Sequence, residues 1–105
     1  MKKVTELEFQ EAITEGYTLV DFYADWCGPC KMLQPVLEEL DKEFENKVEI
    51  VKVDVDVEQG LARRFGVQSI PTLILFKDGE PVEKTMGFRP KPAFHQMFAN
   101  HGITK

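Results

Sequence analysis

The chain has 105 residues, which is enough for one domain with a sizeable buried core. Hydrophobic residues make up 43% and charged residues 30%, a balance that is typical of globular proteins and excludes a disordered chain. The formal net charge of −5 argues against general binding to nucleic acid, whose phosphates attract a basic surface. We therefore expect a single domain over residues 1–105 with no nucleic acid as a partner.

The first residues, MKK, look like the basic start of a signal peptide. The polar segment TELEFQEA follows, so the apolar run that such a peptide requires is missing. No apolar run approaches the length of a membrane span. We expect a protein that is not exported and does not insert into a membrane, in the cytoplasm, where thiols are kept reduced.

The first half of the chain predicts a helix, a strand and a second helix. Residues 8–14 (EFQEAIT) carry apolar side chains at helical spacing. Residues 18–24 (TLVDFYA) are rich in β-branched and aromatic residues and predict a strand. A long helix is expected from Pro29 to about Phe44, kinked at Pro35. Its predicted buried stripe is Met32, Leu33, Val36, Leu37, Leu40 and Phe44.

The second half of the chain predicts further strands that alternate with helices. Residues 48–55 (VEIVKVDV) predict a strand and residues 58–65 (EQGLARRF) a short helix. Residues 72–76 and 81–86 are expected to form a hairpin, because Asp-Gly between them is a strong turn signal. The last helix is expected from about Lys91 to Asn100, with three apolar residues facing inward: Phe94, Met97 and Phe98. Strands separated by helices pair in parallel, so the expected fold is α/β, a mixed sheet with an antiparallel C-terminal hairpin and helices on both faces.

Both cysteines of the chain lie in the segment Asp25–Lys31, DWCGPCK. A disulfide between such close neighbours closes a very small loop and would add little stability. A structural zinc site usually needs four ligands, and the only other candidates are His95 and His101. These histidines are separated by about 240° around a helix, so they do not share a face, and we expect both in solvent. A reactive dithiol is favoured over a staple or a metal site.

The position of the cysteines supports this reading. Cys27 follows a strand and precedes Gly28-Pro29, and proline is well suited to the first turn of a helix. Cys27 is therefore expected at the N-cap, where free backbone N–H groups and the helix dipole favour a thiolate. Cys30 lies at helical neighbour spacing from Cys27, and a modest tightening of the first turn would allow a disulfide.

Asp21 interrupts the predicted strand 18–24 and should be buried if helices cover both faces of the sheet. Burial without a partner raises the pKa of a carboxyl toward neutrality, which makes Asp21 a candidate general base for the second thiol. The alternative is an aspartate satisfied by backbone groups or water. Lys52 interrupts the second strand in the same way; it could supply a compensating charge, or it could extend its ammonium to water.

The segment 20–31 (VDFYADWCGPCK) resembles the active-site signature of the thioredoxin family, and the resemblance extends over essentially the whole chain. Pro35, Lys52, Ile70-Pro71-Thr72 and Gly87 match further family positions. The resemblance implies the thioredoxin fold and a cis peptide bond before Pro71. It also implies an enzyme that reduces protein disulfides: Cys27 is the nucleophile, Cys30 the resolving thiol, Asp21 the proton acceptor, and Lys52 the residue that tunes Asp21. The implied substrate groove consists of Trp26, Gly28, Pro29, Ile70, Pro71, Gly87 and Phe88.

The same resemblance implies partners. These are disulfide-containing protein substrates and a thioredoxin reductase, either an NADPH-dependent flavoprotein or a ferredoxin-linked enzyme. No bound cofactor or metal is expected, and the chain contains no Gly-rich nucleotide loop. A monomer is expected.

Three positions depart from the commoner family residues: Tyr23, Ser69 and Phe88 stand where tryptophan, glycine and a small residue are frequent. The last two flank the implied groove and bear on the choice of partner. Two alternatives remain. The first is an oxidase or isomerase, against which the Gly-Pro pair argues. The second is a binding module with an incidental dithiol, docking through Trp26, Ile70 and Phe88.

Overall fold

The computed structural model describes every residue from Met1 to Lys105 and contains five strands and four helices. Their bounds are β1 Lys2–Lys3, α1 Glu6–Ile13, β2 Tyr17–Tyr23, α2 Gly28–Glu43, β3 Val48–Asp54, α3 Gln59–Arg64, β4 Thr72–Lys77, β5 Glu80–Met86 and α4 Lys91–Ala99. The predicted elements are all present, with ends that differ by no more than about two residues.

The strands form one mixed sheet in the order β1-β3-β2-β4-β5. The central strand β2 pairs in parallel with β3 and antiparallel with β4, and β4 continues into β5 as a hairpin. Asp78 and Gly79 form the turn of this hairpin with φ values of 48° and 88°, the left-handed conformation that Asp-Gly favours. The expected mixed sheet with an antiparallel C-terminal hairpin is confirmed.

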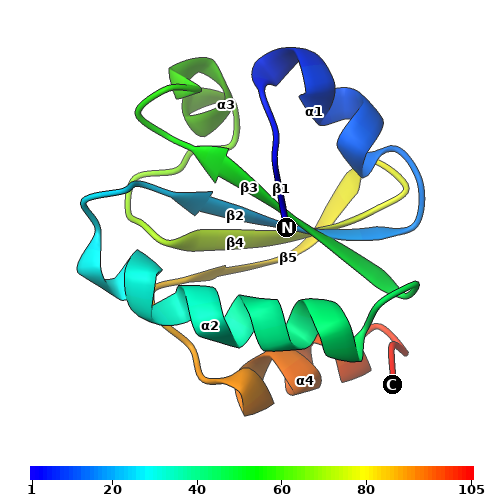
Figure 1. Cartoon of the computed structure of the whole chain (residues 1–105). Coiled ribbons are helices and arrows are strands. Elements are labelled where there is room, and N and C mark those ends of the chain that lie inside the picture. Colours follow the sequence, from blue (N-terminus) through cyan, green and yellow to red (C-terminus); the bar gives the residue numbers. More distant parts are fainter.

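Helices cover both faces of the sheet, as Figure 1 shows: α1 and α3 lie on one side, α2 and α4 on the other. The alternation along β2 divides its side chains between two cores. Leu19 packs in the core under α2 and α4, whereas Val20 and Phe22 pack in the core under α1 and α3. Because neither face of β2 is open to solvent, its one carboxyl, Asp21, is buried.

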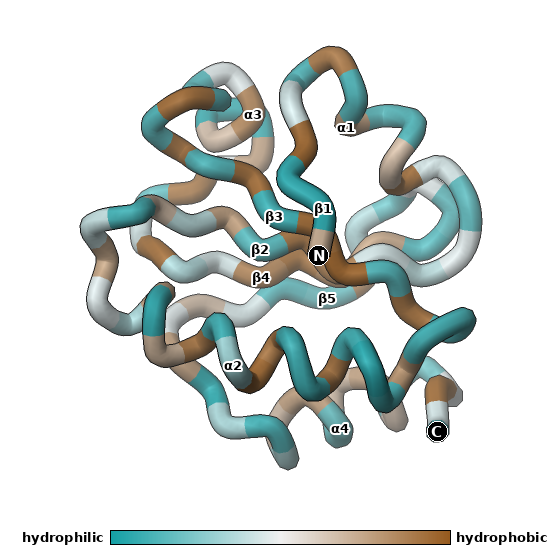
Figure 2. Tube along the Cα trace, in the orientation of Figure 1, coloured by the Kyte–Doolittle hydropathy of each residue, from teal (hydrophilic) through white to brown (hydrophobic).

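Helix α2 runs without interruption through Pro35 and buries one stripe of side chains: Leu33, Leu37, Leu40 and, at its C-cap, Phe44. Teal and brown segments alternate along α2 in Figure 2, as expected of a helix with one buried face. The prediction that Met32 belongs to this stripe is wrong, because its side chain is 63% exposed. Met32 lies about 100° around the helix from Leu33, beyond the edge of the buried face.

Strand β1 has no counterpart among the predicted elements. Lys2 and Lys3 pair in parallel with Val51 and Lys52, and the Val4 N–H donates to the Lys52 carbonyl oxygen at 2.8 Å. Both lysines are exposed. A two-residue edge strand carries no hydrophobic period, so only the neighbouring strand reveals it.

Candidate functional site

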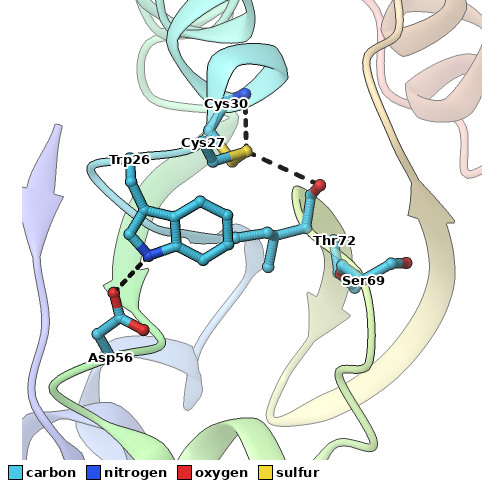
Figure 3. The surroundings of a disulfide bond; sticks show 7 residues. Trp26, Cys27, Cys30, Asp56, Ser69 and Thr72 are labelled. Carbon is cyan, nitrogen blue, oxygen red and sulfur yellow. Dashed lines mark hydrogen bonds between the residues drawn. A yellow bond between two sulfur atoms is a disulfide. The ribbon is translucent and has the colours of Figure 1, made fainter.

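The two cysteines form a disulfide at the first turn of α2, with their Cα atoms 5.2 Å apart. Cys27 is the N-cap, and the Cys30 N–H donates to the Cys27 sulfur at 3.2 Å. This contact, drawn in Figure 3, is the one expected from the position of Pro29 in the first turn. A sulfur in this position is stabilised as a thiolate by the amide and by the positive end of the helix.

An apolar collar surrounds the disulfide. Tyr23 and Ala24 pack with the two cysteines, and Val55 and Ile70 lie against this cluster. Cys27 is only 4% exposed and Cys30 5% exposed. These neighbours leave little of either cysteine in contact with water.

The loop before β4 faces the Cys27 sulfur. The peptide bond between Ile70 and Pro71 is cis, as the resemblance implies, and the Ile70 carbonyl oxygen lies 3.8 Å from Cys27 Sγ. Two hydrogen bonds hold this loop: the Thr72 hydroxyl donates to the Ser69 carbonyl at 2.6 Å, and the Gly87 N–H donates to the Pro71 carbonyl at 2.8 Å. The structure thus brings Ile70, Pro71 and Gly87 together beside the dithiol.

Trp26 projects from the site and is 70% exposed. Its indole N–H donates to Asp56 Oδ2 at 2.8 Å, which fixes the ring beside Cys27 (Figure 3). Gly28 and Pro29 are also exposed. Sequence reasoning misses Asp56, because an acidic residue after a strand carries no signal that it will meet a tryptophan 30 residues away.

Two of the unusual positions have distinct surroundings. The ring of Phe88 is half-buried and packs against the core under α2 and α4, so only part of it is exposed. The Ser69 hydroxyl donates to the sulfur of Met86 at 3.5 Å, and Met86 is 53% exposed. The sequence does not predict this contact, since the end of β5 is brought to Ser69 only by the sheet.

Asp21 is 1% exposed, and its Oδ1 atom has no hydrogen-bond partner. Burial raises its pKa to about 7, and the nearby charge of Lys52, its register neighbour on β3, acts in the opposite direction. A cavity of about 330 Å³ opens beside Lys52 and Cys30. Its lining residues are Tyr23, Ala24, Asp25, Cys30, Lys31, Gln34 and Lys52. The expected burial of Asp21 and the expected rise of its pKa toward neutrality are confirmed.

The two histidines are not simply solvent-exposed, which corrects the prediction. His95 Nε2 lies 2.7 Å from a carboxylate oxygen of Glu43, and His101 Nε2 lies 2.8 Å from one of Glu83. Both rings are partly covered. No three His, Cys, Asp or Glu side chains lie close enough together to hold a metal ion. None of the helices has the length and apolar character needed to span a membrane.

The chain resembles known proteins over nearly its whole length. The thioredoxin family model matches residues 1–100. Thioredoxins from Bacillus subtilis and Staphylococcus haemolyticus are 52% and 54% identical over 99 residues, covering 94% of this chain and 95% of each relative. The solved structure of a mutant thioredoxin from Halobacterium salinarum superimposes with a TM-score of 0.89 at 38% identity, covering 99% of this chain and 92% of that one. With its Cys27–Cys30 pair at the matching place, the chain belongs to the thioredoxin family and is a thiol–disulfide oxidoreductase that reduces protein disulfides.

Proposed function

We propose that Cys27 is the attacking thiol of this reductase and Cys30 the resolving thiol. The observation that carries the assignment is the hydrogen bond from the Cys30 amide to the Cys27 sulfur at the start of α2. The same donor would stabilise negative charge on Cys27 once the disulfide is reduced. Cys30 lies one turn inside the helix, where its sulfur is suited to attack Cys27 and not an external substrate.

The first step is attack of the Cys27 thiolate on a substrate disulfide. A bond forms between Cys27 and one substrate sulfur, the substrate disulfide breaks, and its other sulfur leaves as a thiolate that takes up a proton. In the second step Cys30 loses its proton and attacks Cys27. The Cys27–substrate bond breaks, the second substrate sulfur leaves and is protonated, and the Cys27–Cys30 disulfide forms. Two electrons pass from the dithiol to the substrate.

We assign Asp21 as the acceptor of the Cys30 proton. A carboxyl with a pKa of about 7 is partly ionised at neutral pH and can both take and return a proton there. The cavity beside Cys30 is large enough to hold water, and such water would carry the proton from Cys30 toward Asp21. Lys52 would tune this exchange, because its positive charge favours the carboxylate.

The substrate would bind across the dithiol in a groove made by Trp26, Gly28, Pro29, Ile70, Pro71, Gly87 and Phe88. The exposed indole of Trp26 offers an apolar surface, and the backbone beside Pro71 offers hydrogen-bonding groups to an extended segment. The Ser69–Met86 pair adds a polarizable surface at the edge of the same groove. Because Ser69 is unusual for the family, this edge is where we expect partner preference to differ.

We further propose that the chain works as a single-domain monomer in the cytoplasm, without a bound cofactor. The electrons would come from a thioredoxin reductase, an NADPH-dependent flavoprotein or a ferredoxin-linked enzyme, as is general for the family. The substrates are disulfide-containing proteins. A reducing compartment suits this cycle, because it keeps the Cys27–Cys30 dithiol available.

An insulin-reduction assay with dithiothreitol tests the assignment. The parent should accelerate the precipitation of reduced insulin chains, and Cys27→Ser should reduce the rate to that of dithiothreitol alone. Leu7→Ala, at a position of α1 that is 97% exposed, is the control and should remain active. A Cys27→Ser variant that works as well as the parent would remove Cys27 from the mechanism.

A further inference from the structure

The ammonium of Lys52 lies over an aromatic ring and is not paired with a carboxylate. Its Nζ atom is 4.4 Å from the centroid of the Tyr23 ring, and no carboxylate oxygen lies within 4.0 Å of it. Tyr23 is 5% exposed, so the ring itself is fixed by packing. A cation over the face of an aromatic ring is attracted by the ring's quadrupole, and this holds a flexible lysine side chain in one place.

The location of that ammonium matters for Asp21. Lys52 is the register neighbour of Asp21, both residues face α2, and Tyr23 and Lys52 line the cavity beside Cys30. Coulomb interaction depends on distance, and it is strong where water is scarce. A lysine free to extend into solvent would stabilise the Asp21 carboxylate less than one held over Tyr23.

We propose that Tyr23 is a positioning residue for the reaction: its ring holds the Lys52 ammonium beside Asp21 and thereby sets the proton affinity of that carboxyl. The inference rests on the proposed role of Asp21 as proton acceptor for Cys30. It assigns a role to a position where tryptophan is frequent in the family, and it explains why an aromatic ring suits the end of β2.

Several other charged groups lie near the Tyr23 side chain. The Tyr23 hydroxyl is buried without a hydrogen-bond partner, and burial raises its pKa, so the ring stays neutral. Lys3 on β1 lowers the pKa of the Tyr23 hydroxyl, whereas Asp25 and Asp54 raise it further. From α2, Lys31 and Cys30 line the cavity. Only Lys52 lies over the face of the ring, so the ring rather than the hydroxyl should carry the effect.

A double-mutant cycle read by the titration of the Asp21 side-chain carboxyl carbon in oxidised protein tests the proposal. Tyr23→Phe keeps the ring and should leave the midpoint unchanged. Tyr23→Leu removes the ring and should raise the midpoint by about half a pH unit, toward the higher value of Lys52→Met. In the Lys52→Met background, Tyr23→Leu should add nothing. An equal shift in both backgrounds, or a lower midpoint for Tyr23→Leu, would overturn the proposal.

A second measurement needs no variant. The side-chain methylene protons of Lys52 in the parent should show upfield ring-current shifts, and shifts typical of an unfolded lysine would contradict the contact. The pH profile of insulin reduction separates the role of Asp21 as proton acceptor from the role of Tyr23 in positioning Lys52. If the rates of the Tyr23 and Lys52 variants do not follow their Asp21 midpoints, the role of Asp21 as proton acceptor fails, while the titration cycle alone decides whether Tyr23 positions Lys52.

Discussion

At the scale of single residues, Asp21 shows how burial and a neighbouring charge compete. Burial raises its pKa from 3.8 to about 7, and Lys52 offsets only part of that effect. The carboxylate is therefore costly to the folded protein at neutral pH. Such a group is kept at the expense of stability, which is consistent with a role in proton exchange.

The pKa of Asp21 predicts a pH dependence of stability. Because its folded pKa is higher than the ordinary unfolded value, the folded state binds more protons, and stability falls as pH rises from about 4 to about 7. Between pH 5 and pH 8 this group should cost the oxidised protein about 2–3 kcal/mol. Urea unfolding at the two pH values measures the loss. Asp21→Asn should remove most of it, and an equal loss in parent and variant would contradict the assignment.

Some site residues could be predicted from the sequence, and others could not. Two-residue alternation in β2 places Asp21 inside, and Pro29 places Cys27 at a helix N-cap, because both signals are local. The Trp26–Asp56 and Ser69–Met86 contacts join distant segments and have no local signal. The cis bond before Pro71 is expected only through the family resemblance.

At the scale of elements, α2 and α4 are joined by an ionic cluster centred on Glu43. Its carboxylate lies 2.6 Å from Lys91 Nζ and 2.7 Å from His95 Nε2. The hydrogen bond from Lys91, followed by that from His95, lowers the pKa of Glu43 to about 2. The cluster links the helix that carries the dithiol to the C-terminal helix.

This cluster should stabilise the fold only while Glu43 is ionised. Since its folded pKa is lower than the unfolded value of about 4.3, the stabilisation is present above about pH 4 and is lost as pH falls toward 2. Glu43→Gln should lower the melting temperature at pH 7 but not at pH 2. Glu39→Gln, whose carboxylate is 3.5 Å from Lys91 and 62% exposed, is the matched control and should have little effect. A Glu43→Gln deficit that persists at pH 2 would contradict this account.

Two adjacent residues of α2, Met32 and Leu33, differ in burial. Leu33 is fully buried and Met32 is 63% exposed. Leu33→Ala removes core packing and leaves a cavity, so it should lower the free energy of unfolding by about 2–5 kcal/mol. Met32→Ala should change it by less than about 0.5 kcal/mol. Denaturant titrations measure both values, and similar losses would show that the buried stripe extends to Met32 after all.

At the scale of the whole molecule, the topology gathers the site at one end of the sheet. Cys27 follows β2 and Asp56 follows β3, and these strands are parallel. Ile70 and Pro71 precede β4, which is antiparallel to β2, and Gly87 follows β5. All four segments therefore meet at the same end of the sheet (Figure 1). The spacing of apolar residues along the chain predicts the strands and helices, but the order of the strands depends on contacts that no single segment encodes.

The same arrangement predicts an ordered pattern of hydrogen exchange. Strand β2 is paired on both sides and almost entirely buried, whereas β1 has two exposed residues and β5 is an edge strand with no fully buried residue. Amides of β2, β3 and β4 that are hydrogen-bonded to a neighbouring strand should exchange most slowly, near the rate of global unfolding. Amide exchange followed by NMR checks this, and faster exchange in β2 than in β5 would contradict the described sheet.

The division of labour between the two cysteines is tested most directly by trapping the mixed disulfide. Cys30→Ser, in reduced form, is mixed with a disulfide-containing protein, and the products are measured by intact-mass spectrometry without reductant. We expect a stable one-to-one adduct through Cys27, because the resolving thiol is missing, and no adduct with Cys27→Ser under the same conditions. If Cys27→Ser forms the adduct and Cys30→Ser does not, the roles of the two thiols are reversed and the account is wrong.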